Sequence, residues 1–386
     1  MSVFLSVVIP CLNEADTLST VLRKVHKAMT SLPDVTYELI VADNGSTDGS
    51  IDIAKNNEAS VVHVATKGYG AALMSGIEAA VGEWIVMGDA DDSYDFLELP
   101  KFIKQMEIGV DIVHGCRLPT GGGTIAPGAM PWSHRYIGNP MFSFLTRTWF
   151  RAPIHDVYCG MRGFRKEAYL RLRQRCTGME FATEMIIKAS LFGLSFREVP
   201  ITLHKDGRIA HPPHLRTMRD GWRTLRFFLL CSPNWLFFVP GVASITLGLV
   251  AAFLGFSKSQ IGGIHFDLNT LLCGCFMVLI GFQSVLFALM SKTYAINNGI
   301  LPDEEAVKSF FKIFTLEKTL ICASVVFIAS LIPIVFLGSS WAGSGFGNLE
   351  FSMSIRILVT SLTVAMISLQ SILFGFFTSM LSLEKR

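Results

Sequence analysis

Short apolar runs alternate with helix-period segments through the first half of the chain. FLSVVI (4–9), YELIVAD (37–43), SVVHVA (60–65), EWIVMGD (83–89) and DIVHG (111–115) have the length and the Val and Ile content of strands. Each of the first four is followed by a polar turn and then by a stretch with helical periodicity. Strands that are apolar on both faces and alternate with helices predict a mostly parallel sheet in an α/β domain.

The pattern changes after residue 226, where charged residues become rare. Four segments contain no charged side chain: 227–257, 268–291, 319–349 and 357–383. Each supplies the roughly 20 apolar residues that a helix needs to cross the hydrocarbon core of a bilayer. A buried helix of a soluble protein would explain one such run but not four in succession. We predict four transmembrane helices, at about 235–256, 268–291, 319–338 and 357–383, with a loop after Gly338.

The connections between these predicted spans differ in charge. The 292–318 connection and the C-terminal tail together hold six Lys and Arg, whereas the two opposite loops hold only Lys258 and Arg356. Connections rich in Lys and Arg stay in the cytoplasm. We therefore expect a multi-pass integral membrane protein whose N-terminal domain and C-terminus are cytoplasmic.

Composition follows the same division. Of the 64 charged side chains, 49 lie in residues 1–234 and 15 in residues 235–386. We predict a soluble α/β domain at 1–210, a basic amphipathic juxtamembrane segment at 211–234 and a transmembrane domain at 235–386. In the middle segment, four arginines recur at spacings of three and four, on one helical face suited to anionic lipid headgroups. They are Arg216, Arg219, Arg223 and Arg226.

Two classes of protein are disfavoured by composition. The net charge is only +2, and nucleic-acid-binding domains usually carry a strong basic excess, so we expect no nucleic-acid partner. The eight Cys include no C-x-x-C pair, which indicates neither a disulfide framework nor a zinc site.

Polar or glycine-rich segments follow the first four predicted strands. They are PCLNE (10–14), DNGSTDGS (43–50), TKGYGAAL (66–73) and DADDSYD (89–95). In such sheets ligands bind beyond the carboxyl ends of the strands, so we expect a binding site there. No G-x-G-x-x-G follows the first strand, which disfavours a Rossmann dinucleotide fold.

The segment DADD carries the strongest chemical signal. Asp89 and Asp91 lie on the same side of an extended chain, because side chains alternate with a period of two. Two adjacent carboxylates are costly unless a cation neutralises them, and their oxygens favour Mg²⁺ or Mn²⁺. An acidic turn that caps the next helix is the alternative interpretation. At the other strand ends, Asp43 is suited to accept nucleobase N–H groups, and Gly68 lets a backbone approach a ligand.

Together these segments, followed by transmembrane helices, resemble the family 2 glycosyltransferases with a GT-A fold. The likeness is greatest to polyprenyl-phosphate glycosyltransferases, a group that includes dolichyl-phosphate mannose and glucose synthases. It covers about residues 4–230 and rests on VVIPCLNE, the D-x-G-S turn, the glycine pair after Lys67, and DADD. The family often has a second Asp in its turn, where this chain has Asn44.

The resemblance implies a role for individual residues. The donor nucleotide would be bound by Pro10, Glu14, Asp43, Gly68 and Asp89. Asp89 and Asp91 would hold the metal and the diphosphate. The resemblance further implies that Arg117 lies near the phosphates, that Arg135 meets the acceptor phosphate, and that Asp156 lies near the acceptor, with Asp91, Arg117 and Asp156 as the catalytic residues.

The implied reaction is the inverting transfer of one hexose from a nucleotide-sugar to a polyprenyl or dolichyl monophosphate. The donor would be of the GDP-mannose or UDP-glucose type. Two alternatives stay open. One is a processive membrane polysaccharide synthase, although no Q-x-x-R-W box follows the acceptor region; the other is a non-catalytic nucleotide-binding membrane transporter or scaffold. The sequence leaves the sugar, the nucleotide, the metal and the oligomeric state undetermined.

Overall fold

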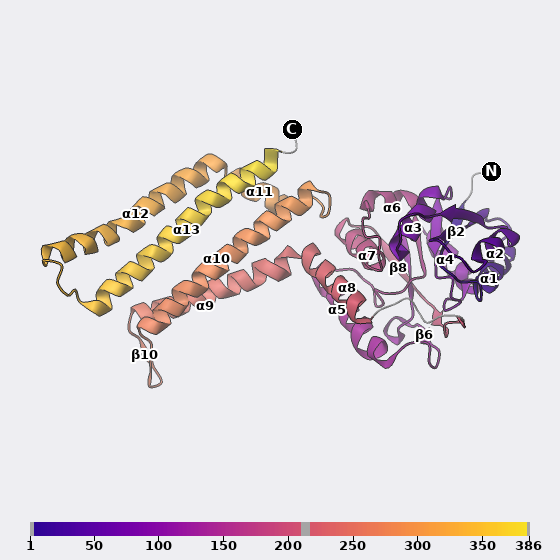
Figure 1. The fold of residues 1–386 in the computed structure, drawn as a ribbon, viewed down its shortest axis with the longest axis horizontal. Helices are drawn as coiled ribbons and strands as arrows, with labels where there is room; N and C mark the ends of the chain where they lie inside the picture. Colours follow the sequence, from indigo (N-terminus) through magenta and orange to yellow (C-terminus); the bar gives the residue numbers. More distant parts are fainter. Residues whose placement is uncertain (1–3, 210–216, 384–386) are drawn as a thin grey trace. The chain divides into compact units, whose positions relative to one another are not determined.

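The computed structural model describes residues 4–209 and 217–383 and divides into two compact units between Phe228 and Leu229. The first unit is built on a seven-stranded sheet in the order β3-β2-β1-β4-β7-β5-β8 (Figure 1). Its strands are β1 (Leu5–Cys11), β2 (Tyr37–Asp43), β3 (Ser60–His63), β4 (Trp84–Met87), β5 (Ile112–Cys116), β7 (Arg162–Arg165) and β8 (Phe196–Pro200). Strand β7 is antiparallel to both of its neighbours, and the other pairs are parallel. The predicted mostly parallel α/β sheet is confirmed.

Helices cover both faces of this sheet because its strands are apolar on both sides. Val7 of β1 packs in a core with Leu22 of α1 (Leu18–Thr30) and Phe102 of α4 (Leu99–Glu107). Its neighbour Val8 packs in a second core with Leu73 of α3 (Tyr69–Ala79) and Met185 of α7 (Phe181–Leu191). The polar segments singled out in the sequence follow the carboxyl ends of β1, β2, β3 and β4.

Four further helices complete this unit: α2 (Ser50–Asn56), α5 (Asn139–Phe150), α6 (Lys166–Leu172) and α8 (Thr217–Cys231). The connections between the main strands contain a second, two-stranded parallel sheet, formed by β6 (Thr124–Ile125) and β9 (Thr202–Leu203). The rings of Phe142 and Phe150 on α5 meet Phe228 of α8 with centroids 5.5 and 5.4 Å apart. Helix α8 covers the C-terminal part of the predicted basic segment, and residues 211–216, with Arg216, lie outside the described residues.

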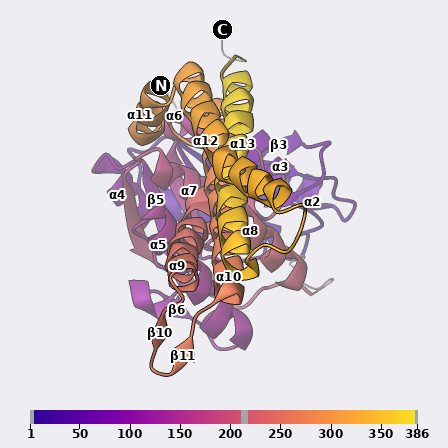
Figure 2. The same ribbon diagram turned by 90° about the vertical axis from the view of Figure 1, so that its left-hand side faces the viewer.

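The second unit consists mainly of long apolar helices. In the part of the chain that the structure describes, four helices are long and apolar enough to cross a membrane: Asn234–Phe256, Leu268–Asn297, Leu316–Gly343 and Phe351–Leu381. They comprise α9 (Val239–Phe256, preceded by a π-helical turn), α10 (Leu268–Asn297), α12 (Leu316–Gly343) and α13 (Phe351–Leu383). The shorter α11 (Glu305–Ile313) joins α10 to α12, and α9 packs along α10 as α12 does along α13 (Figures 1 and 2). The four predicted spans are confirmed.

Three helix ends lie five or six residues beyond the predicted spans, and one of them is the end of α10, at Asn297. The loop expected after Gly338 is helical as far as Gly343, where Ser339 and Ser340 donate hydrogen bonds to the Phe336 carbonyl of their own helix. Helix α13 begins at Phe351, whereas the predicted span begins only after the charged residue Arg356. That charge, Arg356, is buried, because its guanidinium donates to the Gly255 carbonyl and to the Asp267 carboxylate.

Glycines bring α9 and α10 together. Gly241, Gly248 and Gly255 recur every seven residues on α9, opposite Gly274 and Gly281 of α10. A Cβ on Gly248 would lie 2.8 Å from the Gly274 carbonyl oxygen, so neither backbone leaves room for a side chain. Small residues at such positions allow the close backbone approach by which helices associate in lipid.

Candidate functional site

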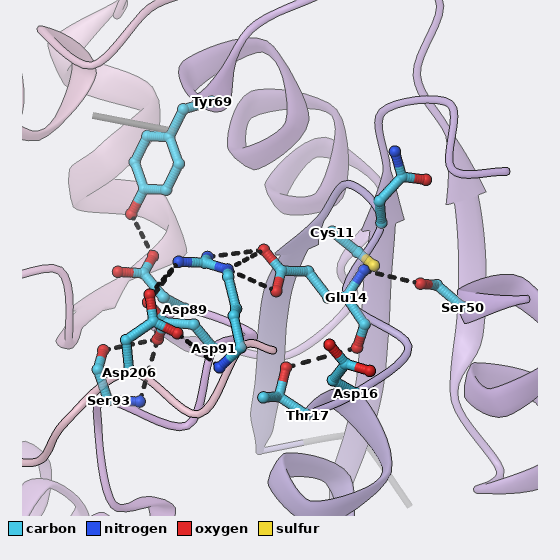
Figure 3. A network of polar contacts seen from close by, with 12 residues as sticks. Cys11, Glu14, Asp16, Thr17, Ser50, Tyr69, Asp89, Asp91, Ser93 and Asp206 are labelled. Atoms are coloured by element: carbon cyan, nitrogen blue, oxygen red, sulfur yellow. Dashed lines mark hydrogen bonds and ion pairs between the residues drawn. The ribbon is translucent and has the colours of Figure 1, made fainter. Parts of the chain in front are cut away.

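Carboxylates gather where β1 and β4 end. Glu14 follows β1, and Asp89 and Asp91 follow β4, the strand paired with β1. Figure 3 shows Glu14, Asp89, Asp91 and Asp206 close together, with Tyr69 beside Asp89. The parallel pairing of the two strands therefore brings three of the predicted residues to one place.

Asp89 and Asp91 are held by different partners. The Tyr69 hydroxyl donates to Asp89 Oδ1 at 2.9 Å, whereas Asp91 Oδ1 accepts from the Ser93 amide and hydroxyl at 3.0 and 2.6 Å. Burial and the neighbouring charge of Asp91 raise the pKa of Asp89 to about 7. Ionisation of both carboxyl groups at the same time is therefore unfavourable unless a positive charge lies close by.

Arg208 supplies the balancing charge within the chain. Its Nε lies 2.9 and 2.8 Å from the two carboxylate oxygens of Glu14. Its Nη1 lies 2.7 Å from Asp206 Oδ2 and 3.1 Å from Asp91 Oδ2. Sequence reasoning missed this residue, because nothing in its local pattern separates it from the arginines of the adjacent basic segment.

Backbone hydrogen bonds fix the loop that carries Arg208. The His204 amide donates to the Ser93 carbonyl, and the Gly207 amide donates to the Asp91 carbonyl, at 2.9 and 3.0 Å. The Ile209 amide donates to Asp16 Oδ2 at 3.1 Å. The loop is therefore tied to the DADD turn on one side and to the segment after β1 on the other.

The DNGS and KGYG turns are tied to each other through Asn44. Its amide nitrogen donates to the Thr66 carbonyl at 2.8 Å, while its amide oxygen accepts from the Gly68 amide at 2.8 Å. An Asp at this position has no N–H to donate, so it could not make both bonds. The departure from the family pattern at Asn44 therefore has a structural reason.

The other predicted donor-site residues shape the same edge of the sheet. Asp43 is buried and accepts from the amides of Gly45 and Ser46, at 3.2 and 2.9 Å. Pro10 lies within the fully buried β1. Gly68 has a φ of +141°, and a Cβ there would lie 2.2 Å from the Thr177 carbonyl oxygen. In this structure the backbone that approaches Gly68 closely is therefore the chain's own, at Thr177.

Arg117 and Asp156 form a buried two-point ion pair. Arg117 Nε donates to Asp156 Oδ2 at 2.7 Å, and Nη2 donates to Oδ1 at 2.9 Å. Burial opposes ionisation of Asp156, but the Arg117 guanidinium holds the pKa of that carboxyl below its ordinary value. Asp156 has no exposed surface, so the structure joins it to Arg117 and leaves it without direct access to solvent.

Tyr94 connects this ion pair to the DADD segment. Its hydroxyl accepts from Arg117 Nη1 at 3.3 Å and from the Gly160 amide at 2.8 Å. Gly160 faces the other cluster, since a Cβ there would lie 2.9 Å from Asp89 Oδ2. Arg117 and Asp89 consequently belong to one continuous site.

Arg135 lies in a separate part of the same unit. It stands in the π-helical turn His134–Gly138 before α5, with its guanidinium 5.4 Å from the centre of the Tyr136 ring. Burial and the positive charge of Arg117 lower the pKa of the adjacent His134, which places this turn near Arg117. Among the described residues Arg135 makes no ion pair. The structure does not bring it into contact with Asp89 or Asp91.

The residues present fit a divalent cation in part. Asp89 and Asp91 offer carboxylate oxygens, and burial together with the charge of Asp91 raises the pKa of Asp89, so a cation at this place would favour the ionised form of both. Within residues 4–209 and 217–383 there is no group of three or more His, Cys, Asp or Glu able to enclose a metal ion. A cation here would need further oxygens from a bound molecule or from water.

Two family comparisons match separate parts of the chain. Residues 6–173 match "Glycosyl transferase family 2", and residues 289–382 match "Glycosyltransferase family 2 C-terminal transmembrane region". The two matches fall in the two units that the structure separates.

Two relatives come from Haloferax volcanii. The "Low-salt glycan biosynthesis hexosyltransferase Agl6" is 35% identical over 364 residues, which is 94% of this chain and 86% of that protein. The "Dolichyl-phosphate hexose transferase" is 31% identical over 198 residues, or 51% of this chain and 81% of that protein.

Solved structures resemble the chain more distantly. Glucosyl-3-phosphoglycerate synthase from Mycobacterium tuberculosis, solved with Mn²⁺ and uridine diphosphate, is 21% identical with a TM-score of 0.45. That match covers 59% of this chain and 78% of the other.

The relative that is similar along almost the whole chain, together with the two family matches, leads to one conclusion. This chain is a glycosyltransferase with transmembrane helices and belongs to glycosyl transferase family 2.

Proposed function

We propose that this glycosyltransferase moves one hexose from a nucleotide-sugar to a polyprenyl monophosphate, with inversion at the sugar carbon. The observation that carries the proposal is the continuous site that runs from Glu14, Asp89 and Asp91 through Tyr94 to the Arg117–Asp156 pair. The names of the two Haloferax relatives, a hexosyltransferase and a dolichyl-phosphate hexose transferase, support the hexose and the lipid acceptor.

The carboxylate cluster is suited to the donor. In this proposal Pro10, Glu14, Asp43 and Gly68 form the nucleotide side, and Asp89 and Asp91 hold Mg²⁺ or Mn²⁺. When bound, the cation would neutralise charge on the leaving diphosphate. Arg208 already pairs with Glu14 and Asp91, so its guanidinium stands beside the place where that diphosphate would arrive.

Arg117 is suited to the charge that develops on phosphate oxygens. Its guanidinium is held in a fixed plane by both oxygens of Asp156, and a preorganised donor stabilises developing charge without reorganising. The acceptor phosphate has a second pKa of about 6 and is largely ionised at neutral pH, so it needs no strong general base. We therefore assign Asp156 the role of positioning Arg117, not of removing a proton.

The acceptor side is proposed to lie at Arg135. The segment that carries it exposes large apolar side chains: Trp132, Tyr136, Ile137, Met141 and Phe144. Such side chains are favourable at a membrane interface, where Trp and Tyr commonly lie at headgroup level. Helix α8 adds the exposed Arg219 and Arg226, whose charges favour anionic lipid headgroups. We further propose that this unit faces the cytoplasm, as the distribution of Lys and Arg in the connections indicates.

A transfer assay tests the proposal. Purified enzyme is given radiolabelled GDP-mannose or UDP-glucose, polyprenyl phosphate and Mn²⁺, and the lipid products are separated. We expect a single sugar on the lipid with one of the donors, and Asp91→Asn to lower transfer at least about 100-fold while the protein stays folded.

Other products would exclude the proposal. A polymer would indicate a processive synthase, and nucleotide binding without any transfer would indicate a transporter or scaffold. Full transfer in EDTA, or full activity of Asp91→Asn, would refute the metal assignment even if a lipid-linked sugar forms.

A further inference from the structure

The transmembrane unit contains a cavity of about 990 Å³ that the proposed reaction does not use. Helix α13 contacts both α10 and α12 (Figure 1), and residues of all three helices line the cavity. The same cavity is lined by Phe310 and Phe311 of α11 and by Phe314, which directly follows this helix. The volume is in the range of pockets that hold small ligands.

The floor of the cavity is a strip of small residues on α13. Ser368, Ser371, Gly375 and Thr378 follow one another at spacings of three and four, so they lie on one helical face. The three hydroxyls donate to carbonyls of their own helix, each at 2.9 Å. Since these hydroxyl groups already donate within the helix, this side of the cavity offers a ligand room but few hydrogen-bond donors. Such a floor suits a hydrocarbon chain better than a sugar or a nucleotide.

The walls have the same character. Leu286 and Leu289 of α10 and Val326 of α12 face the cavity. Thr293 also lines it, but its hydroxyl donates to the Leu289 carbonyl at 2.8 Å. An apolar ligand therefore loses no hydrogen bond on entering from the bilayer.

Charge is confined to the end formed by α11 and the residues before it. Lys308 pairs with Asp303 at 3.0 Å, and Glu304 pairs with Lys292 at 2.5 Å. Lys312 also lines the cavity and has no carboxylate partner among the residues that the structure describes. Of the four charged side chains that line the cavity, Asp303, Glu304 and Lys308 are thus paired, and Lys312 is the one without an ion pair among the described residues.

An apolar cavity that has one unpaired lysine at its end matches an anionic amphiphile. We propose that the cavity binds an anionic phospholipid of the surrounding bilayer, with an acyl chain along α13 and the phosphate at Lys312. Bilayer phospholipid is the most abundant molecule of this chemistry around a transmembrane unit, and basic residues beside a membrane favour anionic headgroups. The inference does not depend on the identity of the sugar donor or acceptor.

Lipid retention and lipid titration test the proposal on the full chain. The protein is purified in a non-ionic detergent, and retained lipids are identified by native mass spectrometry. Delipidated protein is then titrated with phosphatidylglycerol or phosphatidylcholine while its thermal midpoint is followed. We expect one retained anionic phospholipid and about five-fold stronger binding of phosphatidylglycerol, as one lysine near an anionic lipid is worth about 1 kcal/mol.

Two variants address the two ends of the ligand. Gly375→Leu adds a large side chain at a position that lines the cavity, where a Cβ would meet Leu316 at 3.4 Å, and it should abolish retention. Lys312→Gln should bring the ratio of the affinities for phosphatidylglycerol and phosphatidylcholine close to one. The matched controls are Gly338→Leu on α12, whose Cβ meets nothing within 4 Å, and Lys258→Gln, an exposed lysine after α9. Both controls should retain lipid as the wild type does.

Several results would overturn the proposal. One is wild-type protein that retains no phospholipid, or that retains polyprenyl phosphate in its place. Another is equal binding of phosphatidylglycerol and phosphatidylcholine by the wild type. A third is a Lys312→Gln variant that keeps the full preference for phosphatidylglycerol. If Gly375→Leu does not fold, the wild-type titration and the surface variant Lys312→Gln still decide the question.

Discussion

The two basic residues assigned to phosphates differ in how far the fold already occupies them. Arg117 is paired through both its Nε and its Nη2 with Asp156, whereas Arg135 makes no ion pair among the described residues. A guanidinium that has no carboxylate partner can pair with an anionic ligand without first giving up another ion pair. Arg135 is therefore the better candidate for an acceptor that arrives from outside.

Replacing Arg135 should weaken use of the acceptor but not of the donor. A charge-assisted contact to phosphate is worth about 1.5–3 kcal/mol, so Arg135→Ala should lower apparent acceptor affinity about 10- to 150-fold. Arg135→Lys keeps the charge without the planar fork and should fall between wild type and Ala. Acceptor titration and calorimetry with nucleotide-sugar and metal measure the two sides. Loss of donor binding with a normal acceptor titration would place Arg135 on the diphosphate.

His114 should make the protein sensitive to acid. It is fully buried, with Nε2 2.6 Å from the Asp156 carbonyl oxygen; burial and the charge of Arg162 lower its pKa from 6.5 to about 3. Above pH 6.5 the imidazole is neutral in both the folded and the unfolded chain. As the pH falls from 6.5 toward 3, only the unfolded chain gains this proton, so the free energy of unfolding decreases.

The size of this effect is measurable. Between pH 7.5 and 5 the histidine should cost about 2 kcal/mol of stability. Thermal midpoints of wild type and His114→Gln across this range measure it, and the variant should show a shallower dependence on pH. Parallel profiles would show that other groups cause the loss.

At the scale of elements, the sequence was most informative where the apolar pattern was continuous. The first five strands and the four spans were predictable because each is a mainly apolar run bounded by polar residues, short in the strands and long in the spans. Strand β7 was not, because its sequence is RGFR and begins with a charged residue. Arg162 is nonetheless fully buried, since carbonyls of Val157 and Cys159 accept its hydrogen bonds at 2.9 and 2.8 Å.

The candidate site was predictable to a similar extent. Its motif residues follow strands, and parallel pairing brings strand ends together, so Glu14, Asp89 and Asp91 could be placed. Arg208 could not, because its position depends on a loop tied to DADD by the backbone of His204 and Gly207. The burial of Asp156 also depends on tertiary packing that leaves no local pattern.

The packing of α9 on α10 predicts a specific sensitivity. Gly248→Leu places a side chain where the Gly274 carbonyl lies, and overpacking typically costs about 1–3 kcal/mol. We expect a lower thermal midpoint for Gly248→Leu than for the wild type in detergent. Gly338→Leu, in an open position on α12, should leave the midpoint unchanged. Equal midpoints for the two variants would show that the glycine contact contributes nothing.

At the scale of the whole molecule, the four spans predict where each connection lies. An even number of crossings returns the chain to the side on which it began, and the Lys-rich 292–318 connection is expected there. A reporter fused after Arg386 should therefore be cytoplasmic, and one inserted at Gly345 should not. Accessibility labelling in intact cells compares the two positions. Reversed labelling would overturn the orientation, and labelling of both on one side would overturn the number of crossings.

The order of strands in the first unit has a consequence for synthesis on the ribosome. Strand β7 lies between β4 and β5, although it follows both of them in the chain. A nascent chain that ends before Arg162 therefore holds a four-stranded sheet fragment with an open edge at β4, together with the unpaired strand β5, and unpaired edges promote aggregation. The edges close only when residues 162–165 have left the exit tunnel, and β8 completes the sheet about 35 residues later, still ahead of the first span. Delivery to the membrane and completion of the catalytic sheet are thus separated in time by the chain's own order, and the interval before β7 emerges is when chaperone protection matters most.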